Sequence, residues 1–178
     1  LVSSSAVLEN PAEVEARLLK SLSSTDASAY RSNEGAVAAG SVCDRVRSRY
    51  RLLYPSYFRQ VPNSATLDRG TYSAYFDMLA RRMNYSNDGK RFDVRAELSR
   101  IKAPTLVIAG RHDLVTPLAF SEELAAGIRD SRLVVLDHSA HFPFLEENYL
   151  FTEWTWRFIM ATGDRVNESS AVSVTTSK

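Results

Sequence analysis

The 178-residue sequence has a single cysteine, Cys43, which excludes an internal disulfide and any zinc site built on cysteines. It also lacks an excess of either charge, because 22 Lys and Arg face 21 Asp and Glu, a net charge of +1. Dedicated nucleic-acid binders usually carry a strongly basic face, so we expect no nucleic acid as partner. No apolar run approaches the roughly 20 residues that span a bilayer, and the N-terminus lacks a basic-then-apolar signal pattern, so no membrane partner is expected.

The composition that remains, 44% hydrophobic and 24% charged, is typical of a folded protein. The chain begins without Met, and its apolar pair Leu1-Val2 runs into a serine cluster. This pattern predicts the end of a strand that meets a loop, and we expect a longer polypeptide to have preceded it.

The first 98 residues are expected to be mostly helical. Asn10 and Pro11 form a helix start signal, and apolar residues follow at four-residue spacing up to Leu22. Three further helices are expected, over residues 30–39, 44–54 and 68–83.

The pattern changes to alternating strand and helix in the second half of the chain. Short β-branched runs at 104–110 and 132–136 predict two strands buried in a parallel sheet. One helix is expected to begin at Thr116-Pro117 and another to cover 146–160, with a flexible tail over 163–178. The fold class is therefore α/β, and because two parallel strands are not stable alone, the rest of the sheet is expected to come from elsewhere.

Both predicted strands are followed by residues able to do acid–base chemistry. Gly110-Arg-His-Asp113 follows the first strand, and Asp137-His-Ser-Ala-His141 follows the second. Ligands and catalytic groups collect beyond the carboxyl ends of such strands, so a carboxylate and an imidazole can meet there. The carboxylate would orient the imidazole, which then takes a proton from a nucleophile.

Several of these side chains could instead have structural roles. Asp113 could cap a turn, His112 and His138 are expected to be loop residues, and Glu146 is expected to cap the final helix. The three histidines lack the i, i+4 spacing of zinc ligands, so neither a metal nor another cofactor is implied.

The stretches 101–113 and 136–147 resemble the α/β-hydrolase fold superfamily. The first is similar to its penultimate core strand with the triad acid, which implies that role for Asp113, and the second to its Ser-Gly-His-x-Pro loop, which implies the triad base for His141. The phrases His-Phe-Pro-Phe-Leu-Glu-Glu and Tyr-Pro-Ser-Tyr-Phe look most like the proline iminopeptidase group. The resemblance divides the chain into the end of a core strand, a helical cap or lid, the last two β-α units and a flexible tail, over 1–5, 6–97, 98–162 and 163–178.

Two departures from the family pattern affect this interpretation. The Gly-x-Ser-x-Gly nucleophile elbow and the oxyanion-hole strand are absent, and in the family both precede the cap. The resemblance therefore implies that an N-terminal segment of the same hydrolase, with strands one to six, the nucleophile elbow and the oxyanion hole, is the partner of this chain. Ala140 stands where the family usually has Gly, which is acceptable if its φ is negative.

The resemblance implies a serine-type hydrolase that cleaves an ester or amide bond of a small-molecule substrate, with an N-terminal peptide bond as a special case. Aromatic residues could line its pocket or belong to a core, and the pocket candidates are Tyr54, Tyr57, Phe58, Tyr72, Phe76 and Phe142. Three alternatives stay open. With an Asp nucleophile the protein would be a dehalogenase or epoxide hydrolase; it could also be a non-catalytic ligand-binding member of the fold, or a standalone helical interaction module.

Overall fold

The computed structural model describes residues 1–7, 11–36, 53–60 and 93–169. The expected helix over 68–83 and most of the one over 44–54 lie outside these residues. The elements, in chain order, are α1 (Pro11–Ser21), α2 (Ser24–Ala36), the 3-10 helices η2 (Tyr54–Tyr57) and η3 (Arg95–Arg100), β1 (Thr105–Gly110), α6 (Leu118–Gly127), β2 (Ser131–Leu136), α7 (Pro143–Glu146) and α8 (Asn148–Ser169). Within the described part, no helix is both long and apolar enough to cross a membrane.

The two predicted strands pair in parallel, with Thr105 opposite Ser131 and Gly110 opposite Leu136. The first residues of the chain pair on the other side of β1, where Val2 forms a parallel bridge with Ile108. The backbone nitrogen of Leu1 donates to Leu106 O at 2.8 Å, and the nitrogen of Ile108 donates to Leu1 O at 2.9 Å. Strand β1 is therefore an interior strand, which explains why all its residues after Thr105 are buried.

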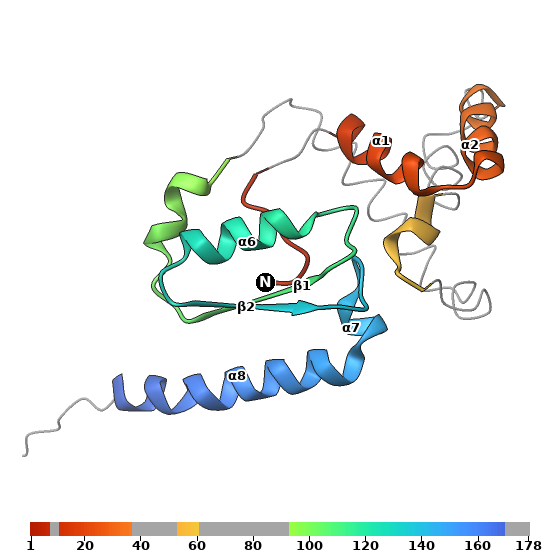
Figure 1. Ribbon diagram of the computed structural model, residues 1–178. Coiled ribbons are helices and arrows are strands. Elements are labelled where there is room, and N and C mark those ends of the chain that lie inside the picture. The colour runs from red at the N-terminus through yellow and green to blue at the C-terminus, as the bar shows by residue number, and fades with distance from the viewer. Residues whose placement is uncertain (8–10, 37–52, 61–92, 170–178) are drawn as a thin grey trace, which may run out of the picture.

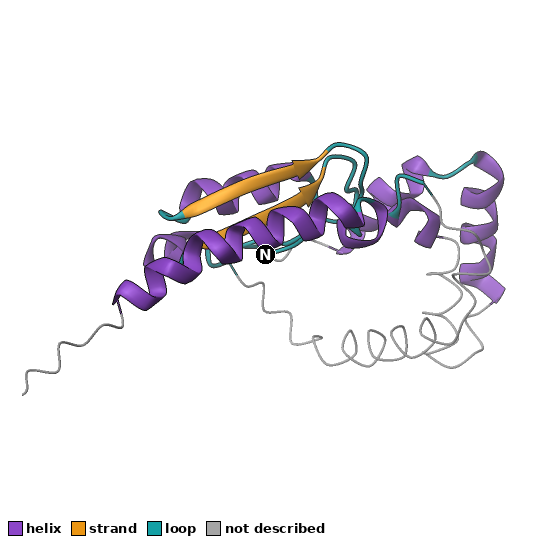
Figure 2. Cartoon of the chain, turned by 90° about the horizontal axis from the view of Figure 1, so that it is seen from below, coloured by secondary structure: helices purple, strands orange, loops and turns teal. Residues whose placement is uncertain are grey.

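Helices cover both faces of the sheet, so the core has two layers of side chains (Figures 1 and 2). Successive residues of β1 point to opposite faces. Val107 packs with residues of the chain start, of η3, of α6 and of the position just after α6, which are Ala6, Leu98, Leu124 and Ile128. Its neighbours on the other face pack with β2 and with Phe151, Trp154 and Phe158 of α8.

The helices α1 and α2 and the 3-10 helix η2 lie beyond the carboxyl ends of the strands (Figure 1). We call α1, α2 and residues 53–60 the helical segment. Its own core consists of Leu18, Tyr30 and Leu53, and the loop residues Leu114 and Val115 pack against it. The helical segment therefore contacts the loop that follows β1. Its assignment as a cap stays a prediction.

Three element boundaries differ from the sequence-based expectations. Helix α2 begins at Ser24 rather than near residue 30. The hydroxyl of Ser23 accepts the backbone N–H of Asp26 at 3.1 Å and donates to its carboxylate at 2.7 Å, which caps the helix early.

The final helix is divided, and it is longer than expected. Pro143 starts the short α7, the chain leaves helical geometry at Glu147, and α8 begins at Asn148. Helix α8 continues through Ser169, so it is longer than the expected 146–160 and includes the first residues of the segment that is predicted to be a flexible tail, 163–178. A single interior glycine, Gly163, costs a helix only about 1 kcal/mol relative to alanine and does not end it.

Candidate active site

Two loops at the carboxyl ends of β1 and β2 form the candidate site. They are held together through their backbones: the nitrogen of Arg111 donates to Leu136 O at 2.9 Å, and that of His112 donates to Ser139 O at 3.0 Å. Gly110 permits this approach, because a Cβ there would lie 2.0 Å from the carbonyl oxygen of Ala140. The sequence places these loops side by side because the strands before them are neighbours.

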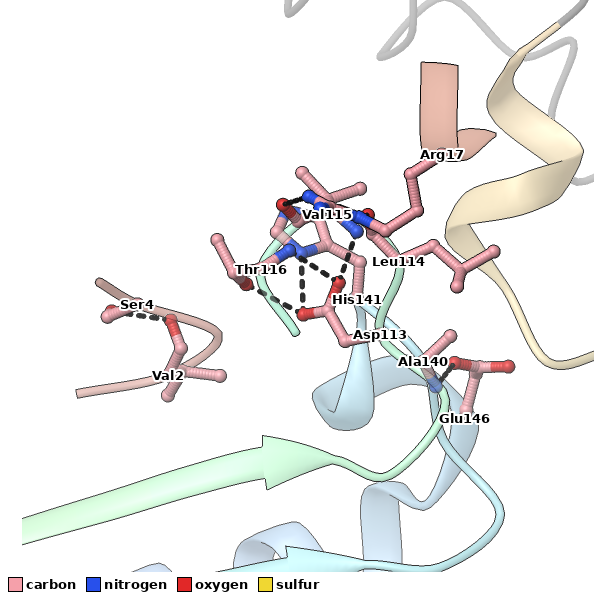
Figure 3. Close-up of polar contacts among 10 residues, drawn as sticks. All are labelled: Val2, Ser4, Arg17, Asp113, Leu114, Val115, Thr116, Ala140, His141 and Glu146. Atoms are coloured by element: carbon pink, nitrogen blue, oxygen red, sulfur yellow. Dashed lines mark hydrogen bonds and ion pairs between the residues drawn. The ribbon is translucent and has the colours of Figure 1, made fainter. Parts of the chain in front are cut away.

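The carboxylate of Asp113 accepts four hydrogen bonds (Figure 3). Oδ1 accepts the backbone N–H groups of Val115 at 2.8 Å and Thr116 at 2.9 Å. Oδ2 accepts the Thr116 hydroxyl at 2.8 Å and faces Nδ1 of His141 at 2.9 Å. The side chain is only 1% exposed, so these bonds replace the water that an ionised carboxylate needs. Asp113 is therefore a turn cap and the partner of His141 at the same time.

The geometry fixes which ring nitrogen of His141 can do proton chemistry. An ionised carboxylate only accepts hydrogen bonds, so Nδ1 must carry the proton that lies between His141 and Asp113. Nε2 is then the nitrogen able to take a proton from another group. The His141 side chain is 20% exposed, which leaves it reachable from outside the core.

Ala140 replaces the usual glycine of the family without a positive φ angle. Among the described residues other than glycine, positive φ occurs at Ser3, and Ala140 is not in that class. Ala140 is also 1% exposed, so its methyl group is packed rather than strained.

Aromatic rings surround His141, in a group that includes three of the predicted pocket residues. Tyr57 lies edge-on to the imidazole at 5.4 Å, and Phe142 lies 5.1 Å from it between ring centroids. Phe142 also contacts Tyr57 at 5.9 Å and Phe58 at 5.0 Å. Tyr57 therefore contributes its ring to the surroundings of the imidazole.

A pocket of about 560 Å³ lies between the helical segment and the loop after β1. Its lining comes from the α1–α2 junction, from η2 and the residues after it, and from Arg111 to Leu114. Of the predicted pocket residues, Phe58 lines it. Tyr54 is the first residue of η2, and Tyr72 and Phe76 lie outside the described residues. Substrate binding by these residues stays a prediction.

Sequence reasoning missed the role of two neighbouring glutamates. Glu146 was expected to cap the final helix, but its Oε2 accepts the backbone N–H of Ala140 at 2.7 Å, and its Oε1 accepts those of Arg59 at 2.6 Å and Gln60 at 3.1 Å. Glu147 accepts the N–H of His138 at 2.9 Å. The bonds from Glu146 to Arg59 and Gln60 join segments 87 and 86 residues apart, so no local sequence pattern signals them. The bonds to Ala140 and His138 span 6 and 9 residues, and they depend on how the loop after β2 folds back on α7.

The other two histidines take part in loop structure. Nε2 of His112 lies 3.1 Å from the carbonyl oxygen of Asp137, whose carboxylate pairs with Arg111 at 2.6 Å. The backbone of His138 is bound by Glu147. No group of three or more His, Cys, Asp or Glu suited to a metal ion occurs in the described ranges.

Comparison with known proteins assigns the family. Residues 15–148 match the model of the alpha/beta hydrolase fold. The chain belongs to the α/β hydrolase fold family. The match includes both loops of the candidate site and extends into the helical segment, so the superfamily and the α/β fold class predicted from the sequence are confirmed.

Known members of the α/β hydrolase fold family are similar over parts of the chain. A putative carbamate hydrolase, RutD, of Pseudomonas savastanoi pv. phaseolicola is 34% identical over 100 residues, which cover 54% of this chain and 38% of that protein. A pimeloyl-[acyl-carrier protein] methyl ester esterase of Nitrosomonas europaea is 40% identical over 53 residues, 30% of this chain and 21% of that protein. The chain thus spans well under half the length of these relatives.

Solved α/β hydrolases have the same fold. The structure of a proline iminopeptidase from Mycobacterium smegmatis matches with a TM-score of 0.57 and 22% identity, over 84% of this chain and 52% of that one. This likeness supports the fold and leaves the substrate open.

Proposed function

We propose that this chain supplies the acid and the general base of a serine-type α/β hydrolase. The observation that supports this most strongly is the 2.9 Å contact between Nδ1 of His141 and the buried carboxylate of Asp113, at the carboxyl ends of two neighbouring parallel strands. This is the pairing that base-assisted nucleophilic attack requires.

In the proposed reaction Nε2 of His141 takes the proton of a serine hydroxyl as the serine oxygen attacks the substrate carbonyl. The tetrahedral intermediate collapses when the leaving alcohol or amine receives that proton from His141. Water then attacks the acyl-enzyme and loses its proton to Nε2. The bond to the serine oxygen breaks, that oxygen takes the proton back from His141, and the acid product leaves. Asp113 stays ionised throughout and stabilises the imidazolium.

The serine is proposed to lie on an N-terminal segment that also carries strands one to six and the oxyanion hole. One edge of the segment Leu1 to Ser3 pairs with β1, and further strands would pair with the opposite edge of that segment. The helical segment would then be the cap, a lid over the site, and the pocket beside Asp113 would be part of the space between cap and core.

The proposed substrate is a small molecule with an ester or amide bond. Two similar proteins are named as hydrolases of a carbamate and of a methyl ester, which are acyl compounds of this type. The aromatic rings around His141 suit an apolar acyl group or side chain. An N-terminal peptide bond is a special case within this class.

Substitutions of the acid and the base test the proposal in the complete protein. With p-nitrophenyl esters as substrate, Asp113→Asn and His141→Gln are each expected to lower kcat about 10⁴-fold, because the first gives the wrong imidazole tautomer and the second removes the base. Thermal unfolding checks that the variants fold. Turnover that survives in the folded His141→Gln variant would contradict the proposal.

The choice of substrate and the His141→Gln variant together distinguish this proposal from two alternatives, an enzyme with an Asp nucleophile and a non-catalytic member of the fold. A dehalogenase or epoxide hydrolase would turn over haloalkanes or epoxides and leave the esters untouched. A non-catalytic member would bind ligand with equal affinity in wild type and His141→Gln and hydrolyse nothing.

A further inference from the structure

Besides the apolar packing of Leu114 and Val115, an arginine of the helical segment binds the loop of the acid. Arg17 lies on α1, and its Nε donates to the carbonyl oxygen of Leu114 at 2.6 Å while its Nη2 donates to that of Val115 at 3.3 Å (Figure 3). These residues directly follow Asp113, whose carboxylate holds the N–H of Val115. The peptide after the acid is thus bound on one side by Asp113 and on the other by Arg17.

The loop of the base is tied to the helical segment by a carboxylate. Glu146 lies on α7 and binds the N–H of Ala140, the residue before His141, with one oxygen. Its other oxygen binds the N–H groups of Arg59 and Gln60, which follow η2. The backbone nitrogen of His141 in turn donates to Tyr57 O at 2.9 Å.

We propose that Arg17 and Glu146 are positioning residues that align the Asp113–His141 pair by fastening both loops to the helical segment. The inference rests on the proposed function, since it assigns how that same acid–base pair is held. Hydrogen bonds with one charged partner are roughly twice as strong as neutral ones, and each bond made by the Arg17 or Glu146 side chain described above is of this kind. The pair is therefore aligned only when the helical segment is docked.

The two side chains touch the backbone of the loops and reach neither reacting group, so their effect should fall on kcat. A displacement of 1 Å in a catalytic group can cost about 100-fold in rate. The conservative variants should retain part of the function. Gln at 146 keeps one acceptor oxygen, and Lys at 17 can still bind one of the two carbonyls.

The experiment compares Glu146→Ala, Glu146→Gln, Arg17→Ala and Arg17→Lys with wild type in the complete protein. Glu153→Gln is the matched control, because that carboxylate pairs with Arg157 on α8 and touches neither loop. With p-nitrophenyl butyrate we expect kcat to fall about 10- to 100-fold in the alanine variants and less in Glu146→Gln and Arg17→Lys, with KM within about 2-fold of wild type. Glu153→Gln should match wild type.

Proton NMR measures the hydrogen bond between His141 and Asp113 directly, without relying on turnover. The Nδ1 proton of His141 should give a low-field proton resonance in ¹⁵N-histidine-labelled wild type, assigned by its loss in His141→Gln. It should be weakened or absent in the alanine variants and retained in Glu153→Gln. A variant too unstable to measure is replaced by its Gln or Lys counterpart.

Normal kcat and an unchanged resonance in Arg17→Ala and Glu146→Ala would overturn the inference, as would a loss confined to KM. If Asp113→Asn and His141→Gln keep their turnover, the proposed function itself fails. If those two lose turnover while the alanine variants keep it, only the positioning role fails.

Discussion

At the scale of single residues, the carboxylate of Asp113 satisfies two interpretations that competed in the sequence. Residue type alone favours a turn cap, and Oδ1 does bind the N–H groups of Val115 and Thr116. The flanking patterns favour a triad acid, and Oδ2 does face His141. The roles are compatible because Oδ1 binds the backbone of the turn, while Oδ2 faces His141 and also accepts the Thr116 hydroxyl, which fixes the direction in which it points.

The carboxylate of Asp93 has a lowered pKa, so its contribution to stability depends on pH. Asp93 accepts hydrogen bonds from the Arg95 side chain, with Nε at 2.9 Å from Oδ1, and from its backbone N–H at 3.1 Å, and these lower the pKa of Asp93 from 3.8 to about 2. A lowered pKa means that the pairing stabilises the fold above about pH 4 and that this contribution is lost as the pH falls through about 2.

We expect the ¹³Cγ shift of Asp93 to titrate with a midpoint near 2, as measured by NMR on the complete protein. In Arg95→Gln the midpoint should return toward 3.8. A wild-type midpoint already near 3.8 would contradict the contact.

At the scale of elements, the end of β1 depends on a residue without a side chain. A Cβ on Gly110 would meet the carbonyl oxygens of Ala140 at 2.0 Å and Ser139 at 2.6 Å, and backbone atoms cannot rotate away. Gly163 in α8 offers the opposite case, since nothing lies within 4 Å of a Cβ there.

Gly110→Ala is expected to lower the free energy of unfolding by about 1–3 kcal/mol, because the two loops must move apart. Gly163→Ala should be neutral or stabilise the protein by up to about 1 kcal/mol, since alanine favours helix. Urea unfolding of both variants measures the difference. Equal stability of Gly110→Ala and wild type would show that the loops are not in close contact.

Much of the element pattern could be predicted from the sequence, because it depends on local signals. The β-branched runs gave both strands, and the Asn-Pro start signal placed α1. The early start of α2 depends on a side-chain cap by Ser23, and the interruption between α7 and α8 depends on backbone geometry at Glu147.

The candidate site was predictable only in part. Asp113 and His141 follow strand ends, which are visible in the sequence. The contacts of Arg17 and Glu146 are long-range, since each side chain binds backbone groups far along the chain, and no periodicity encodes them.

At the scale of the whole molecule, one helical surface carries exposed apolar side chains. The outer side of α7 and α8 exposes large apolar side chains, including Leu145, Tyr149, Trp156, Ile159 and Met160. Such a patch is typical of an interface. We propose that the N-terminal segment covers part of this patch and extends the sheet beside residues Leu1 to Ser3.

We propose that His141, oriented by Asp113, activates a serine of that segment. Labelling of the complete protein with a fluorophosphonate, followed by peptide mass spectrometry, tests it most directly, because this reagent reacts with serines activated by an adjacent base. We predict one adduct, on a serine of the N-terminal segment, formed rapidly in wild type and far more slowly in His141→Gln and Asp113→Asn. An adduct that forms equally fast in His141→Gln, or no adduct in a protein that hydrolyses esters, would contradict the account.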